Sequence, residues 1–252
     1  MSEFIEKLKR GTQHTSAPLG FHSKPAKDKP KMLLIACITE PAMKNAEDLL
    51  AGADAAILTI NDLVPGLESL RRFAKIKPDI PWGGWLKNIQ WLKNEFPETE
   101  ADYFVFTTDD PIINLPVKIG KILEINNLLT DMMIRAIEDL PIEAIMLSDD
   151  TGNLLNWRHI LTLQRLDNLV SKPILIKAPA EIARGNLSTL WEVGVDGIVV
   201  EVGNGQPKDT LQELRLMIDK VSFPIPRKTK KTNVRLPFIN TEAAKEEEEE
   251  PE

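Results

Sequence analysis

Eight apolar segments of strand length, their regular spacing and a repeated turn predict a (β/α)8 barrel for most of this 252-residue chain. The segments are continuous rather than alternating, which is typical of parallel strands that are covered on both faces. Their starts lie 19 to 30 residues apart, which leaves room for a helix in each crossover. The segments are residues 33–39, 55–61, 80–86, 102–108, 121–126, 143–148, 173–178 and 197–202.

The repeated turn joins the end of a helix to the next strand. Residues 50–57 have the sequence LAGADAAI, and residues 192–199 have the similar sequence EVGVDGIV. We predict that Gly52 and Gly194 end their helices in the left-handed conformation, with an Asp and a buried strand after each. Weaker versions of the turn begin the fourth and sixth segments. A turn that recurs at wide intervals indicates repeated structural units.

Helical periodicity fills several of the intervals between these segments. Helices are predicted at 154–170 and 209–221, whereas two prolines leave little room for a helix in 109–120. A further helix, capped by Asn127, is expected to turn its apolar residues inward. These residues are Leu128, Leu129, Met132, Met133, Ala136, Ile137 and Leu140. A doubly wound sheet is the alternative fold, but no Gly-x-Gly-x-x-Gly follows the first segment.

Three regions are expected along the chain: an N-terminal extension at 1–31, the barrel at 32–223 and a tail at 224–252. In the extension, Ser2 is expected to cap a short helix that ends at Gly11 and carries Phe4, Ile5 and Leu8 on one face. The tail is basic and then acidic, and its run of glutamates predicts disorder.

Charge and composition exclude several functional classes. The net charge is −7, with +4 on residues 1–31, +5 on 227–235 and −6 on 242–252, which leaves −10 for the remainder. An acidic body argues against nucleic-acid binding, which requires a basic face. No apolar run suits a transmembrane segment or a signal peptide, so a cytoplasmic protein is expected. The single cysteine, Cys37, rules out an internal disulfide and is expected to be a buried, inert thiol.

Lys177 and Glu201 are the first candidates for catalysis, because barrel enzymes place their sites at the carboxyl ends of the strands. Each residue interrupts an otherwise apolar strand, where an unpaired charge would be costly. They are expected either to form an ion pair that closes the top of the barrel or to take part in chemistry. In the second case, Lys177 is a Schiff-base amine or an anion anchor, and Glu201 is its base or orienting group. Glu124, in the fifth segment, is the third candidate.

Further polar residues follow other segments. Asp109 and Asp149 follow the fourth and sixth segments, the first and last of three consecutive segments that end in acidic residues, and they would suit Mg2+, although Asp is also common in turns for local reasons. The three histidines lie in the extension and in a helix, so a zinc site is not expected. Thr39 and Lys87 also stand at segment ends. The predicted ligand-binding residues are Glu40, Asn61, Trp85, Thr107, Ser148, Gly203, Asn204 and Gly205.

Residues 173–202, and above all the phrase GVDGIVV at 194–200, resemble the last helix-to-strand turn of the phosphate-binding (β/α)8 barrels. These include ribulose-phosphate-type, tryptophan-biosynthesis-type and flavin-type enzymes, and the resemblance implies a phosphate cradle of glycines after strands 7 and 8. The chain departs from that pattern with Ala178-Pro179-Ala180 after strand 7 and with Glu201 in strand 8. Gly185 and the 203–205 run would have to supply a displaced cradle.

Two functional hypotheses follow. The first is an enzyme of lyase, aldolase or isomerase type that acts on a small polar metabolite at the mouth of the barrel. The second is a non-catalytic ligand-binding or scaffold barrel whose charged ends bind protein partners. Contact of the basic segments with a membrane surface is a weaker possibility.

Overall fold

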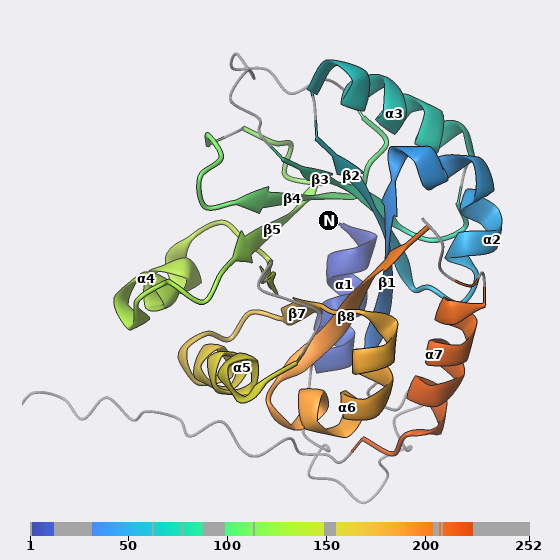
Figure 1. The fold of residues 1–252 in the computed structure, drawn as a ribbon. Coiled ribbons are helices and arrows are strands. Elements are labelled where there is room, and N and C mark those ends of the chain that lie inside the picture. The colour runs from blue at the N-terminus through green and yellow to red at the C-terminus, as the bar shows by residue number, and fades with distance from the viewer. Residues whose placement is uncertain are drawn as a thin grey trace, which may run out of the picture.

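The computed structural model describes residues 2–12, 32–61, 63–76, 78–87, 99–112, 114–148, 155–203, 207 and 209–223. Eight parallel strands form a closed barrel in chain order, so the predicted fold is confirmed and the doubly wound alternative is wrong (Figure 1). All eight predicted segments are strands. They are β1 Leu33–Thr39, β2 Ala55–Ile60, β3 Trp82–Leu86, β4 Tyr103–Thr107, β5 Gly120–Ile125, β6 Ala144–Leu147, β7 Ile174–Lys177 and β8 Val195–Val202.

Helices surround the barrel and cover its outer face (Figure 1). They are η1 Glu40–Asn45, α2 Ala46–Leu50, α3 Leu63–Ile76, α4 Asp131–Ala136, η2 Ile137–Asp139, α5 Trp157–Leu169, α6 Ala180–Glu192 and α7 Thr210–Lys220. As the prolines predict, the described residues between β4 and β5 contain no helix. In the part of the chain that the structure describes, no helix has the length and apolarity to cross a membrane.

Alternate strand residues build two separate cores. One set packs outward against the helices. The other set fills the barrel and includes Ile57, Ile122, Leu175 and Val199. Because side chains alternate along a strand, the residue two positions after each of these also faces the barrel axis. This alternation turns Thr59, Glu124, Lys177 and Glu201 inward at the carboxyl ends of their strands.

The repeated turn forms as predicted, and its acidic residue has a defined role. Gly52 and Gly194 have φ values of 90° and 95°. Asp54 accepts a hydrogen bond from the amide of Leu34 at 2.8 Å, and Asp196 accepts one from Ile174 at 2.7 Å. Glu143 likewise accepts from Lys121 at 2.7 Å. In all three cases, a carboxylate beside one strand satisfies an amide near the start of the preceding strand.

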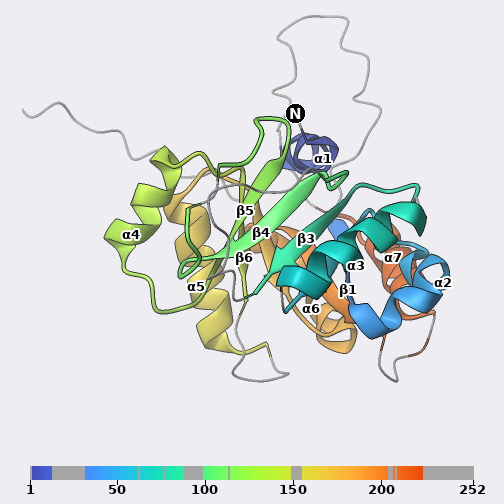
Figure 2. The same cartoon turned by 90° about the horizontal axis from the view of Figure 1, so that it is seen from above.

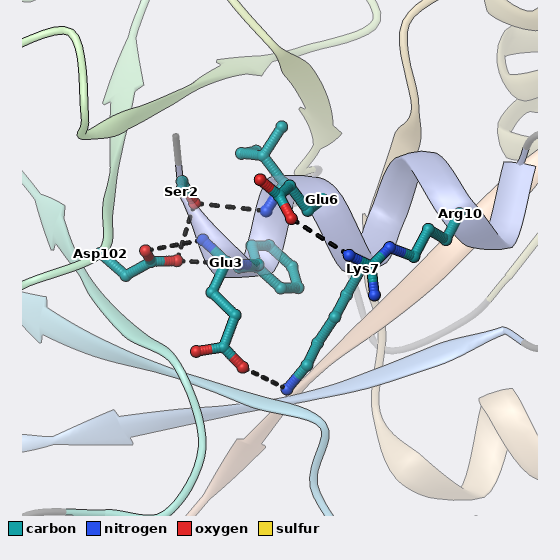
Figure 3. A network of polar contacts seen from close by, with 8 residues as sticks. Ser2, Glu3, Glu6, Lys7, Arg10 and Asp102 are labelled. Atoms are coloured by element: carbon teal, nitrogen blue, oxygen red, sulfur yellow. Dashed lines mark hydrogen bonds and ion pairs between the residues drawn. The ribbon is translucent and has the colours of Figure 1, made fainter.

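Asp102 occupies the same place before β4 but holds a different segment, helix α1 (Glu3–Thr12). Its carboxylate accepts hydrogen bonds from Ser2 Oγ at 2.7 Å and from the amides of Glu3 and Phe4 at 2.9 Å each (Figure 3). Ser2 Oγ accepts from the Ile5 amide at 3.2 Å, which confirms the predicted cap. The helix continues past Gly11 to Thr12, so the predicted end is one residue short.

Helix α1 closes the amino-terminal end of the barrel (Figure 2). The predicted apolar face of Phe4, Ile5 and Leu8 is buried in the inner core, with at most 1% of each side chain exposed. The Phe4 ring stacks on Tyr103 with 4.5 Å between centroids. A Cβ at Gly120 would lie 2.7 Å from Ile5 Cγ1, so the start of β5 has to be a glycine for α1 to approach. The helix is therefore part of the barrel core.

The helix predicted from Asn127 is wrong in its start and in most of its buried face. Thr130 is the N-cap, and its side chain accepts a hydrogen bond from the Met133 amide. Only six residues are α-helical, so Leu128 and Leu140 lie outside the helix and are 81% and 46% exposed. Ile137 is buried as expected, and so is Ile134, which was not among the residues predicted to turn inward. Met132 lies about 200° around the helix from Ile134. It is therefore 83% exposed, and Met133 is 52% exposed.

Candidate functional site

Lys177 and Glu201, predicted from their positions in two apolar strands, come together at the carboxyl end of the barrel. Lys177 Nζ lies 3.4 Å from Glu201 Oε2, and the two side chains are 26% and 52% exposed. The contact joins β7 to β8 across neighbouring strands. Both charges therefore remain partly solvated while they pair, which removes most of the cost of placing them on inward-facing strand positions.

A fully buried indole connects this ion pair to the other side of the barrel. Trp85 Nε1 donates a hydrogen bond to Glu124 Oε2 at 2.7 Å, which fixes the ring. Lys177 Nζ lies 5.1 Å from the centroid of the Trp85 ring, and Lys87 Nζ lies 4.4 Å from it. Both distances are within cation–π range. We call Lys87, Trp85, Glu124, Lys177 and Glu201 the mouth cluster; four strands or their ends contribute to it.

Cys37 and Thr59 lie next to the mouth cluster on β1 and β2. Cys37 is the register partner of Glu201, and Thr59 is the register partner of Trp85. Cys37 Sγ and Thr59 Oγ1 are 3.2 Å apart. Burial raises the pKa of the Cys37 thiol, and the nearby Lys177 only partly offsets this. A buried, protonated thiol agrees with the inert role expected from the sequence.

Thr39 ends β1 with a hydroxyl that has no partner in the described part of the chain. Its Oγ1 is buried, and a buried hydroxyl without a hydrogen bond costs about 1–3 kcal/mol. Thr39 is the register partner of Thr59, which in turn pairs with Trp85, so the three residues form one rung beside the mouth cluster. Thr59 was not among the sequence candidates. Its position two residues after the buried Ile57, on the same face of β2, could have identified it.

The remaining predicted ligand-binding residues lie around the strand ends. Glu40 begins η1 and is exposed, and Asn61 is exposed directly after β2. Thr107 is half-buried at the end of β4, where it pairs in register with Glu124. Ser148 is 7% exposed. Gly203 has a φ of 125°, whereas Asn204 and Gly205 lie outside the described residues.

Of the two predicted metal ligands, the structure describes only Asp109. Asp109 is exposed in the turn after β4, and its neighbour Asp110 accepts a hydrogen bond from the Thr107 amide at 2.6 Å. This is the local turn bonding that was the alternative explanation for these residues. Among the described residues, no three His, Cys, Asp or Glu side chains are placed to hold a metal ion. Asp149 lies outside them, so the magnesium site stays a prediction.

The prediction of a displaced phosphate cradle is wrong for Gly185. Helix α6 begins at Ala180, directly after Pro179, which has no amide hydrogen to donate. Gly185 lies inside α6 and is exposed, so it belongs to a helix rather than to a loop that could surround an anion. The only glycine of the proposed cradle that the described structure contains in a loop conformation is Gly203.

The closed parallel barrel with its polar carboxyl end defines this chain as a (β/α)8 protein in overall fold. A tryptophan synthase alpha-subunit from Pyrococcus furiosus is similar, with a TM-score of 0.52 and 13% identity over 75% of this chain and 97% of that one. A thiamine phosphate pyrophosphorylase from the same organism has a TM-score of 0.52 and 15% identity over 74% and 96%. At such identities the likeness establishes the fold alone. No protein-family model and no curated protein sequence matches the chain.

Proposed function

We propose that the chain is an enzyme of lyase, aldolase or isomerase type, in which Lys177 attacks the carbonyl group of a small polar metabolite. The observation that carries the proposal is the 3.4 Å contact between Lys177 Nζ and Glu201 Oε2 at the carboxyl end of the barrel. A primary amine next to a carboxylate can exchange protons with it, which is what covalent amine catalysis requires.

The chemistry balances with these two groups alone. The ammonium of Lys177 transfers a proton to Glu201, and the free amine forms a bond to the carbonyl carbon. The carbonyl oxygen then leaves as water after taking up two protons, both of which come originally from the ammonium group and one of which passes through Glu201. The product is a protonated Schiff base, which withdraws electrons from the adjacent carbon–carbon or carbon–hydrogen bond.

Trapping with borohydride tests the proposal. Small aldehydes and ketones are incubated with the protein, borohydride reduces any Schiff base, and the modified lysine is located by peptide mass spectrometry. We expect one dominant adduct, at Lys177, and none in Lys177→Arg. The Lys75→Arg variant is the matched control, because Lys75 is an exposed lysine on α3. Adducts spread evenly over exposed lysines, or no adduct at all, would reject the role of Lys177.

A non-catalytic scaffold barrel is the second candidate, and the exposed apolar side chains of α4 and α5 favour it. Met132 and Trp157 are 83% and 80% exposed. In this case the charged tail recruits partners, and removal of residues 224–252 should abolish their capture. The matching deletion at the other end has to keep residues 2–12, because α1 is part of the core. Capture that is unchanged by the loss of residues 224–252 would reject this candidate.

A further inference from the structure

We infer that the mouth cluster selects carbonyl compounds that carry a carboxylate next to the carbonyl, with Lys87 as the residue that binds the carboxylate. The inference rests on the proposed function of Lys177 and names the substrate class for that same site, the 2-oxo acids. It starts from the charge balance of the mouth cluster, in which two lysines and two glutamates surround one indole.

The two glutamates are already engaged with other partners. Glu201 pairs with Lys177 at 3.4 Å, and Glu124 accepts the indole N–H of Trp85 at 2.7 Å. Lys87 contacts the Trp85 ring, and no acidic side chain within the described residues forms an ion pair with it. The side chain is half-buried, and its ammonium group has three N–H donors. Within the part of the chain that the structure describes, a carboxylate is the partner that this group lacks.

The geometry limits how far apart the carbonyl and the carboxylate can be. The two ammonium nitrogens lie 4.4 and 5.1 Å from the centroid of the same ring, so they are no more than about 9.5 Å apart, and a small molecule bonded to one has only a short distance to span to the other. In a 2-oxo acid, the carbonyl carbon is bonded directly to the carboxylate carbon. A Lys177 adduct would therefore leave the carboxylate near the Trp85 ring, where Lys87 is the available cation.

Hydroxyl groups on the neighbouring rung lie beside the mouth cluster. Thr39 Oγ1 is buried without a partner among the described residues, and Thr39 pairs in register with Thr59, which pairs with Trp85. An unpartnered buried hydroxyl beside the mouth cluster suits a second carboxylate oxygen. A phosphate is a poorer match, because it would draw on backbone amides after β7, where Pro179 has none.

The experiment compares two ketones of equal chain length in the borohydride assay. Pyruvate carries the carboxylate, and hydroxyacetone carries a neutral hydroxyl in its place. We expect the wild type to form the Lys177 adduct at lower concentrations of pyruvate than of hydroxyacetone. In Lys87→Met the half-saturating concentration of pyruvate should rise roughly 10- to 100-fold relative to that of hydroxyacetone, as for loss of a charged hydrogen bond. Lys87→Arg should keep the preference, and Lys75→Met should behave as the wild type.

Failure of the inference can be distinguished from failure of the proposed function. A Lys177 adduct that forms equally well with both ketones, or whose preference survives in Lys87→Met, overturns the inference and leaves the role of Lys177 intact. Lactate, which has the carboxylate but no carbonyl, gives a second measurement by ligand-observed NMR. Lactate that binds the wild type and not Lys87→Met supports the carboxylate site even if no ketone forms an adduct. Equal binding to both proteins, or no binding to either, overturns it.

Discussion

Removal of the Asp102 carboxylate should release helix α1 from the amino-terminal end of the barrel. Asp102→Ala deletes the acceptor of three hydrogen bonds, from Ser2 Oγ and from the amides of Glu3 and Phe4. Hydrogen bonds to a charged group contribute about 1.5–3 kcal/mol each. The Glu3 contact is exposed and the other two are only part-buried, so the lower end applies and water replaces part of the loss. We expect a total loss of about 2–4 kcal/mol in the free energy of unfolding.

The loss should be concentrated in α1, because a helix of ten residues is marginally stable by itself. Its attachment comes from the Asp102 contacts and from the burial of Phe4, Ile5 and Leu8, each of which contributes about 1.5–3 kcal/mol. Without the cap, the helix should separate from the barrel more often than the barrel unfolds. Its amides and its basic residues would then become accessible.

Two measurements check this, with Glu143→Ala as the matched control. Glu143 occupies the equivalent place before β6 but accepts the amide of Lys121 in a strand, so its loss should cost about 1 kcal/mol and leave α1 in place. Denaturant unfolding gives the total change, and amide hydrogen exchange over residues 5–12 gives the local one. The reasoning is refuted if Asp102→Ala matches Glu143→Ala in stability and keeps the exchange protection of α1.

Two further predictions concern glycine and tyrosine. Gly194→Ala should destabilise the fold by about 1–3 kcal/mol, because φ is +95° and a Cβ would meet the Asp167 side chain. Gly185→Ala, in open space within α6, should instead stabilise the fold by about 0.5–1 kcal/mol. Equal denaturation midpoints for the two variants would contradict this. Tyr103 is the only tyrosine, and burial raises its pKa well above the ordinary value of 10.0, so ultraviolet absorbance should show no phenolate until the chain unfolds. The unfolded chain loses the Tyr103 proton at a lower pH than the folded chain does. The contribution of Tyr103 to the free energy of unfolding is therefore complete below pH 10 and should fall by about 1.4 kcal/mol per pH unit above it. Phenolate formation in the native state near pH 10 would refute this.

The strands could be predicted because their signal is local and repeated. Each buried parallel strand is a continuous apolar run, and the Gly-x-Asp turn marks where the helix before it ends. Lys177 and Glu201 could be selected from the sequence because each interrupts an apolar strand, whereas the inner core of the structure shows that they and Glu124 face the barrel axis. The ion pair between Lys177 and Glu201 could be anticipated because both residues stand at similar depth on neighbouring strands.

What the sequence did not reveal depends on contacts between distant segments. Asp102, like Asp54, directly precedes a buried apolar strand, and the two cannot be told apart from that position. Only the arrangement of α1 against the barrel decides that Asp102 accepts hydrogen bonds from a helix N-terminus and not from a strand amide. The partner of Trp85 is Glu124, 39 residues away, and no sequence spacing predicts that hydrogen bond. The exposed face of α4 was also missed, because its apolar residues have helical spacing whether or not a neighbour covers them.

The two ends of the barrel differ in a way that makes the tests at the mouth interpretable. At the amino-terminal end, the inner positions Gly83 and Gly120 leave space that the Tyr103 ring and Ile5 occupy, so that α1 and the strands form a dense apolar core. At the carboxyl end, the inner positions carry partly exposed charges, whose pairing contributes little to stability. Substitutions such as Lys177→Arg and Lys87→Met are therefore expected to remove the proposed chemistry and to leave the core that holds the barrel together unchanged. If either variant lowered the unfolding midpoint as much as Asp102→Ala does, this division between a structural end and a chemical end would be wrong.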